Sequence, residues 1–289
     1  MRIALLLFLM PIVCWAWGFQ GHRIIADIAE KRLTPTTRTL LKPIQYLTRL
    51  QQLSIWPDTI RHYQPHTVDW HYTTAGQSLP NMPPTFKAPG HLPQALCQQF
   101  QLLTTPTTQH WQKRHEALSW VIHLVGDAHQ PLHINQKDDS GANRCQVRWL
   151  NQKKRFNLHQ VWDTLLVKTL PKSLYTHDSS IPDTVLARAP TAWLTEAMRL
   201  HTFIYPKPHK PFCRTAYQHT VYPYHINKYY IHTMQPIVAH QLQLAGQRLA
   251  YWLNDLLDSH FRETHPALQA WPGCVLKPQS FNRQHSTHI

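Results

Sequence analysis

Residues 119–133, SWVIHLVGDAHQPLH, form the segment that we predict to organise the fold. Apolar residues recur at helical spacing along it, including Leu118 just before the segment, Ile122 and Val125, which predicts an amphipathic helix. Pro131 should end that helix, because proline cannot donate an intrahelical hydrogen bond and disfavours a helical residue before it. The sequence therefore predicts a helix that closes on a short proline turn.

Three polar residues of this segment favour a metal site. His123 and Asp127 are four residues apart and project from the same face of a helix. His133 follows on the turn after the helix. Buried polar groups cost free energy unless they are satisfied, and a divalent metal ion would satisfy all three. His129 is two residues past Asp127 and faces elsewhere, so we assign it a supporting or structural role.

A second pair with the same spacing lies downstream. Residues 157–163, NLHQVWD, place His159 four residues before Asp163. One such pair is usually an ordinary pair on a helix surface, but two copies, one followed by His133, favour a metal centre. Imidazole and carboxylate ligands without cysteine suit zinc.

The composition indicates a basic globular protein. The chain has 289 residues, with 43% hydrophobic residues, 29 Lys and Arg against 15 Asp and Glu, and a net charge of +14. This balance favours a polyanionic partner such as nucleic acid, with an anionic membrane surface or simple solubility as alternatives. Because the chain has 22 histidines, a single histidine is weak support for a site, and only the spacing between ligand-type residues indicates one.

The first 16 residues predict a signal peptide. Arg2 supplies the positive start, residues 3–13 supply an apolar run too short to span a membrane, and small residues precede a cleavage site between Ala16 and Trp17. We therefore expect a periplasmic or secreted protein. Four cysteines remain after cleavage and predict two disulfides, with three connectivities open: Cys97, Cys145, Cys213 and Cys274.

The rest of the chain predicts a mostly α single domain over residues 17–289, in which about 272–289 form a tail. Helices are expected over residues 17–33, 35–44, 96–110, 191–203 and 236–257. Residues 68–72, VDWHY, are expected to be extended, and residues 137–150 contribute to a short β-hairpin. In the last helix we expect a core-facing stripe: Val238, Leu242, Ala245, Leu249, Trp252 and Leu256.

Several ordered motifs together resemble the S1/P1 nuclease family of zinc-dependent single-strand nucleases. They are Trp17-Gly18 with His22, WPD at 56–58, WHY at 70–72, HLVGDAHQPLH at 123–133, NLHQVWD at 157–163, and the late helix beginning PIVAHQLQLAGQ at 236. The resemblance implies the multi-helix fold shared with bacterial zinc phospholipase C. It also implies hydrolysis of single-stranded RNA and DNA to 5′-phosphate products, with 3′-nucleotidase activity.

The resemblance implies three zinc ions and assigns ligands to each. The first ion would be held by Asp58, His71, His123 and Asp127. The second would be held by His133, His159 and Asp163. The third would be held by the α-amino group and carbonyl oxygen of Trp17, by His22 and by Asp127, which then bridges two ions. A free amine at Trp17 requires removal of the signal peptide.

The resemblance also implies roles in catalysis and substrate binding. Zinc lowers the pKa of a bound water to near neutrality and so makes a hydroxide nucleophile available. Asp58 would orient that hydroxide, and Arg61 would hold the phosphoryl oxygens. Tyr72 would stack on a base, and Asn143 would contact the base edge.

Two residues depart from the family pattern. Thr74 stands where relatives tend to carry an acidic or amide residue that hydrogen-bonds the base, and Ala142 replaces a glycine next to Asn143. Both departures concern base recognition, so base preference stays open.

Three functions compete on the sequence alone. A nuclease acting as a monomer on single-stranded RNA, DNA and nucleotides, without stable membrane association, is favoured. A zinc phospholipase C would use the same metals on a lipid phosphodiester. A zinc-binding or storage protein would use the many histidines and show no turnover.

Overall fold

The computed structural model describes residues 17–76, 86–87, 90–105, 111–135, 138–176, 181–215 and 218–277. Most of these residues are helical and the strands are few and short, so the predicted mostly α fold is confirmed. The predicted signal peptide, residues 1–16, lies outside the described residues.

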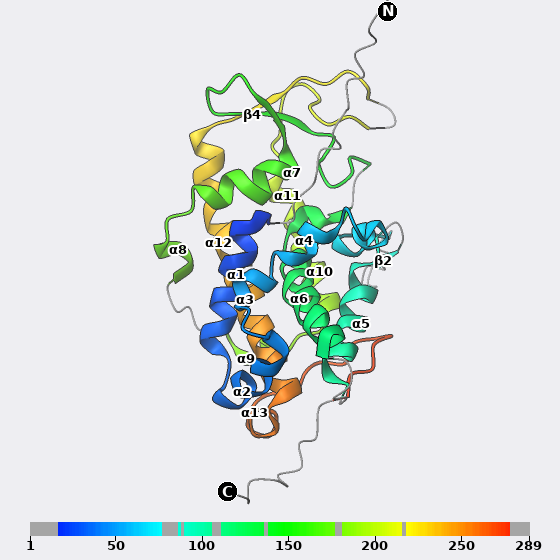
Figure 1. Cartoon of the computed structure of the whole chain (residues 1–289). Coiled ribbons are helices and arrows are strands. Elements are labelled where there is room, and N and C mark those ends of the chain that lie inside the picture. The colour runs from blue at the N-terminus through cyan, green and yellow to red at the C-terminus, as the bar shows by residue number, and fades with distance from the viewer. Residues whose placement is uncertain are drawn as a thin grey trace, which may run out of the picture.

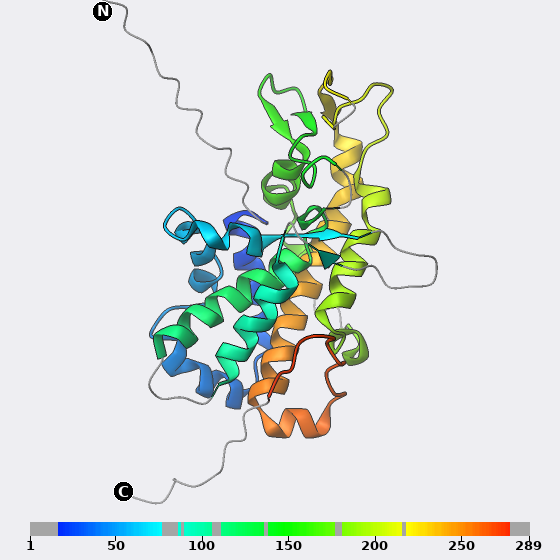
Figure 2. The ribbon, with the colours of Figure 1, turned by 90° about the vertical axis from the view of Figure 1, so that its right-hand side faces the viewer.

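Three helices form the centre of the molecule: α1 (Gly18–Arg32), α6 (Trp111–Ala128) and α12 (Lys228–Leu257). Helix α1 packs against both of the others (Figures 1 and 2). Glycine makes each contact close. A Cβ atom at Gly126 of α6 would lie 2.8 Å from His22 of α1, and one at Gly246 of α12 would lie 2.6 Å from Ile28 of α1. The missing side chains of these glycines therefore let α1 pack closely against both helices.

Helix α6 differs in extent and environment from the helix predicted around residues 119–133. It begins at Trp111, and every residue from Ala117 to Ala128 is buried. The prediction of an amphipathic helix is wrong for this half, because α1, α3, α4, α5 and α12 surround it on several sides. The predicted proline turn is confirmed: the helix ends at Ala128, and the 3-10 helix η2 (Pro131–His133) follows.

The remaining helices cover this centre. Residue Thr34 caps α2 (Pro35–Gln45) by accepting a hydrogen bond from the amide of Thr37, and Pro35 occupies the first helical position. The other helices are α3 (Leu50–Leu53), α4 (Trp56–Ile60), α5 (Leu92–Thr104), α7 (Leu158–Gln160), α8 (Ser173–Thr176), α9 (Asp183–Leu186), α10 (Pro190–Arg199), α11 (His201–Ile204) and α13 (Ser259–Thr264).

Helix α12 carries the predicted core stripe but begins earlier than predicted. All six stripe residues are buried. The helix starts at Lys228, where Asn227 accepts a hydrogen bond from the amide of Tyr230, and it continues through Pro236. Proline removes one intrahelical hydrogen bond, but Tyr230 and Met234 are buried on the turns before it, so that packing holds the helix there.

The first small sheet corrects another prediction. Residues 68–72 were expected to be extended, but Pro65–His71 form the 3-10 helix η1, which starts at a proline as helices often do. Extended backbone begins only at Tyr72 and leads into β1 (Thr73–Ala75). This strand pairs antiparallel with β2 (Phe86–Lys87) and parallel with β3 (Ile134–Asn135). The sheet therefore joins the segment after His71 to the segment after His133.

The second sheet confirms the β-hairpin and adds a strand. Strands β4 (Gln146–Trp149) and β5 (Arg155–Asn157) are antiparallel, and β6 (Tyr224–Ile226) pairs parallel with β4. The order is β5-β4-β6. This sheet lies at one end of the molecule, and α2 lies at the other (Figure 1).

Two disulfides join distant segments. The bonds Cys97–Cys274 and Cys145–Cys213 resolve the connectivity that the sequence left open. The first ties the segment after α13 to α5, so residues 272–277 of the predicted tail are anchored, and residues 278–289 lie outside the described residues. None of the helices that the structure describes combines the length and hydropathy that a bilayer span requires.

Candidate metal centre

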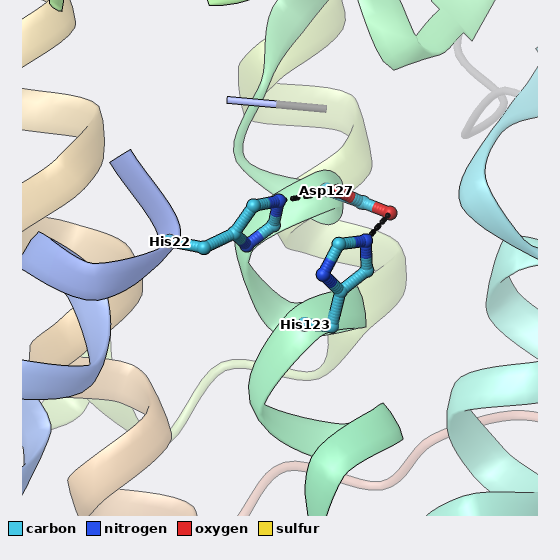
Figure 3. Close-up of side chains that lie close together, drawn as sticks. All are labelled: His22, His123 and Asp127. Carbon is cyan, nitrogen blue, oxygen red and sulfur yellow. Dashed lines mark ion pairs between the residues drawn. The ribbon is translucent and has the colours of Figure 1, made fainter. Parts of the chain in front are cut away.

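The first group of candidate ligands joins α1 to α6. His22, His123 and Asp127 are fully buried and point toward one another (Figure 3). The Nε2 atom of His22 lies 3.4 Å from Oδ1 of Asp127, and Nε2 of His123 lies 3.4 Å from Oδ2. The two imidazole rings stack with centroids 3.9 Å apart, in a space that Gly126 leaves open.

The second group adds residues from α4 and η1. Asp58, His71 and His123 each offer a ligand atom, and these atoms lie within 4.8 Å of one another. The Nδ1 atom of His71 lies 3.0 Å from Nε2 of His123 and 3.1 Å from Oδ2 of Asp127. Asp58 lies 3.8 Å from His123. This group and the first share His123, and both contact Asp127.

The third group comes from two segments that follow α6 in the chain: η2, and the region that begins with α7. His133, His159 and Asp163 are buried, and Nε2 of His159 lies 3.1 Å from Oδ2 of Asp163. His159 belongs to α7, which passes directly into a π-helical turn (Val161–Leu166) that carries Asp163. Single π-helical turns are frequent at functional sites.

Backbone carbonyls orient the imidazoles. The Nδ1 atoms of His123, His133 and His159 contact the carbonyl oxygens of Ser54, His71 and Gly141 at 2.7, 2.6 and 2.6 Å. Each Nδ1 therefore donates, and each Nε2 is left as an unprotonated acceptor that faces its group. Such contacts fix the ring and tautomer of metal-binding histidines.

Several atoms that face the centre lack hydrogen-bond partners among the described residues. Buried atoms in this state include both ring nitrogens of His22, both carboxylate oxygens of Asp58, Nε2 of His71 and His133, and Oδ1 of Asp127. Unsatisfied buried polar atoms are rare in native proteins and call for an explanation. Divalent cations would satisfy them, so the residues present fit a metal centre.

The pKa values agree with that fit. Burial lowers the pKa of His123 to about 3 and lowers the pKa of His22, His71 and His133 well below the usual value. These imidazoles are therefore neutral and able to ligate. Burial raises the pKa of Asp58 to about 7, and the nearby Arg61 offsets only part of that rise. Burial also raises the pKa of Asp127 and of Asp163. A bound cation would favour their charged forms.

Trp17 lies against this centre. Its indole is fully buried and donates a hydrogen bond of 2.9 Å to the carbonyl oxygen of Gly126, between His123 and Asp127 in the chain. Its own carbonyl oxygen accepts from the amide of Gly21 at 3.1 Å. The sequence prediction of a ligand role concerns its backbone atoms, whereas the contact with α6 is made by its indole.

Arg61 and Tyr72 follow ligand-bearing elements directly. The guanidinium of Arg61 lies 3.7 Å from Oδ1 of Asp58, and its side chain is 12% exposed. Tyr72 is half-buried and donates a hydrogen bond of 2.8 Å to Asp69. Burial, and then that hydrogen bond, raise the pKa of Tyr72 to about 12, so its hydroxyl stays protonated.

Asn143 lies on a tight loop that also supports His159. Ser140, Gly141 and Ala142 all adopt positive φ, and Ala142 has a φ of 63°. A non-glycine residue in this region carries strain, so Ala142 departs from the family pattern where glycine would be unstrained. The side-chain amide of Asn143 donates to the carbonyl of Ser140 at 2.9 Å. Thr74 lies in β1, where it is half-buried and pairs with Asn135 of β3.

Gln130 and His129 make contacts near the centre that the sequence did not predict. Gln130 donates a 2.6 Å hydrogen bond to Oδ1 of Asp163 and accepts one from the amide of Leu132. His129 contacts Arg248 of α12 at 3.0 Å and turns away from the centre, in the direction predicted. Gln130 lies inside the quoted motif, but its partner is 33 residues away, and sequence spacing gives no signal for such a contact.

A fourth group of ligand-type residues does not fit a metal. Asp139, Cys145 and Cys213 lie close together. The two cysteines form a disulfide, so neither offers a thiolate.

All of the candidate ligands, from Trp17 to Asp163, lie within the residues that match one protein-family model. A sequence model described as S1/P1 Nuclease matches residues 17–258. Endonuclease 2 of Arabidopsis thaliana is 28% identical over 262 residues, which cover 82% of this chain and 89% of that protein. Endonuclease 4 of the same plant is 27% identical over 279 residues, covering 84% and 90%. Nuclease S1 of Aspergillus oryzae is 25% identical over 179 residues, covering 52% and 54%.

Proposed function

Because this chain belongs to the S1/P1 nuclease family, we propose that it is a zinc-dependent endonuclease of single-stranded RNA and DNA. Its products would carry 5′-phosphates, and it would also act as a 3′-nucleotidase. The observation that carries the proposal is the convergence of three buried groups of His and Asp side chains. Facing atoms of His22, Asp58 and His71, among others, lack hydrogen-bond partners among the described residues.

The proposed ligand sets follow the three groups. One zinc ion would be held by Asp58, His71, His123 and Asp127. A second would be held by His133, His159 and Asp163. A third would be held by Trp17, His22 and Asp127. When bound, the ions supply Lewis-acid chemistry at phosphate and lower the pKa of water.

The two oxygens of Asp127 support a bridging role. Its Oδ1 lies nearer His22, at 3.4 Å, and its Oδ2 lies nearer His71, at 3.1 Å. A carboxylate can offer one oxygen to each of two neighbouring groups, which an imidazole cannot do. This geometry supports the assignment of Asp127 to two ions.

The proposed catalytic roles belong to Asp58 and Arg61. A carboxylate at Asp58 accepts a hydrogen bond from the attacking water and orients it. The guanidinium of Arg61, mostly shielded from solvent, donates to the phosphoryl oxygens as negative charge develops on them. Charge-assisted hydrogen bonds in a buried site are stronger than in water. Tyr72 would stack on the base next to the cleaved bond, and Asn143 would contact its edge.

We propose that the working enzyme begins at Trp17. Signal-peptide removal would expose the α-amine, and export would allow both disulfides to form in the periplasm or outside the cell. The contact between the Trp17 indole and Gly126 supports this, because it anchors the side chain of the first residue of that chain to α6. Residues 17–289 would act as one monomeric nuclease domain.

The test compares two purified chains, one beginning at Trp17 and one that retains Ala16. We expect the first to bind about three zinc ions and to release 5′-nucleotides from single-stranded RNA. The extended chain should bind less zinc and turn over RNA more slowly, because its Trp17 nitrogen is an amide. Zinc content is measured by metal analysis and products by chromatography.

A Trp17→Phe chain that also begins at residue 17 is the matched control. It keeps the α-amine but loses the indole hydrogen bond, so it separates the amine from the side chain. Metal binding without RNA hydrolysis would refute the nuclease proposal. Release of phosphocholine from phosphatidylcholine would then favour a phospholipase, and turnover of neither would favour metal storage.

A further inference from the structure

The sheet β5-β4-β6 belongs to a part of the chain that lacks acidic residues. Residues 140–162 and 197–254 contain no Asp or Glu. Exposed cations in this part are Arg144, Lys153, Lys154, Arg155, Arg199, Lys207, Lys210, Arg214 and Lys228. Arg144 is paired with Asp138 at 3.6 Å, just outside the acid-free range. The end of the molecule formed by this sheet (Figure 2) therefore carries a strongly positive surface.

The register of the sheet places two arginines directly beside each other. Arg148 of β4 is the partner of Arg155 in β5 and of His225 in β6. We call these three residues the arginine row. Like charges in opposed positions destabilise a sheet, and strands lie about 4.8 Å apart, so the row spans about 10 Å. The Nε atom of Arg148 is buried and has no hydrogen-bond partner among the described residues.

One face of the sheet is buried against the body, and the other is open to solvent, as a binding surface requires. Val147, Trp149 and Ile226 alternate with the row and are buried, so they attach the sheet to the body. The row therefore occupies the outer face. A fold that needed only a solvated outer face would gain by opposing Arg148 with a carboxylate, and the sequence has none here.

The outer face is continuous with the candidate nucleoside site. Arg155 donates to Gln146 at 3.3 Å, and Gln146 is the register partner of Asn157. The amide of Asn157 donates to Asn143 at 3.3 Å. A polar path thus runs from Asn143 across β5 and β4 to the arginine row.

At its far end the path reaches a cleft of about 590 Å³. The cleft is lined by Asn151, Gln152, His225 and Lys228, together with apolar atoms of Leu150 and Ile226. A cation also meets an aromatic ring beside β6: Lys210 lies 4.8 Å from the ring centre of the exposed Tyr222. Basic grooves with interleaved aromatic rings are typical of proteins that bind single strands.

We propose that the outer face of β5-β4-β6 is a second binding track, in which the arginine row holds phosphates of the single strand that leaves the catalytic pocket at Asn143. The proposal rests on the proposed function for the identity of the strand in the pocket. It adds that substrates long enough to reach the row bind more tightly than short ones.

The test uses the zinc-loaded enzyme and a fluorescent oligothymidylate of about 30 nucleotides with phosphorothioate linkages, which resist cleavage, at about 50–200 mM salt. Binding is followed by fluorescence anisotropy, beside an oligomer of about 4 nucleotides that fills the pocket alone. The variant is Arg148→Gln with Arg155→Gln. The matched control is Lys42→Gln with Lys113→Gln, two exposed cations from α2 and the start of α6.

Losing two phosphate contacts should weaken long-oligomer binding by roughly tenfold or more at about 100 mM salt, and should lower the slope of log affinity against log salt by about 1.4. The control pair should change neither. The thermal midpoint of the row variant should not fall below that of the control, because a repulsion has been removed. A second variant, Lys154→Gln with Arg155→Gln, changes only exposed side chains and should also weaken long-oligomer binding.

Unchanged affinity in both row variants would overturn the track. So would an equal loss in the control pair, which would indicate net charge alone, or an equal loss on the short oligomer, which would indicate a damaged pocket. Loss of binding to phosphatidylglycerol vesicles with intact oligomer binding would assign the face to membranes instead. Because binding is measured without cleavage, absence of RNA hydrolysis would refute the proposed function and leave this result standing.

Discussion

Gly126 controls the approach of His22 to α6, and Gly126→Ala should test how much the centre depends on that approach. A Cβ atom at this position would lie 2.8 Å from Nδ1 of His22, 2.9 Å from its Cε1 and 3.1 Å from Cδ1 of Ile25. His22 is fully buried and stacked on His123 at 3.9 Å, so its ring has no free space and has to shift with its helix.

The expected effect on activity is larger than the effect on stability. Relieving the contact requires a ring shift of several tenths of an ångström up to about 1 Å, and a misplacement of that size near the chemistry costs up to about 100-fold in rate. Overpacking costs about 1–3 kcal/mol, while alanine gains about 1 kcal/mol over glycine in a helix. We therefore expect kcat/KM on single-stranded RNA to fall by about 10- to 100-fold, with a net loss of unfolding free energy of about 0–2 kcal/mol.

Gly246→Ala is the matched control. Its Cβ atom would meet Ile28 at 2.6 Å and the carbonyl oxygen of Ile25 at 2.8 Å, on the opposite contact of α1 and away from any proposed ligand. We expect it to lose more stability than Gly126→Ala and to keep its kcat/KM per folded molecule. Wild-type activity and zinc content in Gly126→Ala would refute the reasoning, as would an equal loss of activity in both variants at a temperature where both are folded.

Three further predictions concern other parts of the molecule. Leu47 is 100% exposed with a φ of 65°, so Leu47→Gly should raise the free energy of unfolding by about 1 kcal/mol, and a urea titration that shows a loss would contradict this. Arg248 is fully buried and bonded to Glu196 at 2.7 Å. Arg248→Met should cost about 1–3 kcal/mol by the same titration, because buried partners such as His129 lose their hydrogen bond while Glu196 keeps Arg188, and unchanged stability would contradict this. Zinc should displace the proton of Asp58, whose pKa is raised to about 7 in the metal-free chain. Zinc affinity should therefore fall as the pH drops below that value, with proton release measurable in a pH-stat, and pH-independent affinity would exclude Asp58 as a ligand.

The sequence predicted the parts of the fold that depend on local pattern. The stripe of α12 and the cap at Thr34 follow from spacing and side-chain chemistry, and the structure has both. The stop before Pro131 follows from proline geometry and is present as well. Periodicity near His123 could not show that α6 is buried all round, because that depends on several helices distant in sequence.

The sequence predicted candidate ligands where His and Asp recur at helical spacing. It could not predict supporting contacts between residues far apart in the chain. The spacing of His123 with Asp127 and of His159 with Asp163 marks candidate ligands, and the structure brings both pairs into buried groups. The support of Asp163 by Gln130 joins residues 33 positions apart. Residues 68–72 are rich in aromatic and β-branched types, yet they continue the 3-10 helix that starts at Pro65, so local chain direction outweighed strand propensity there.

The position of α1 between two glycine contacts has a consequence for engineering the ion preference of this protein. Gly126 sets how closely α1 approaches α6, and with it the distance from His22 to Asp127, whereas Gly246 meets α1 away from the proposed ligands. Exchanging ligand side chains leaves that distance in place. A library meant to admit an ion of different radius should therefore vary Gly126 and Ile25, which meet where α1 packs on α6, before it varies any residue that would touch the ion.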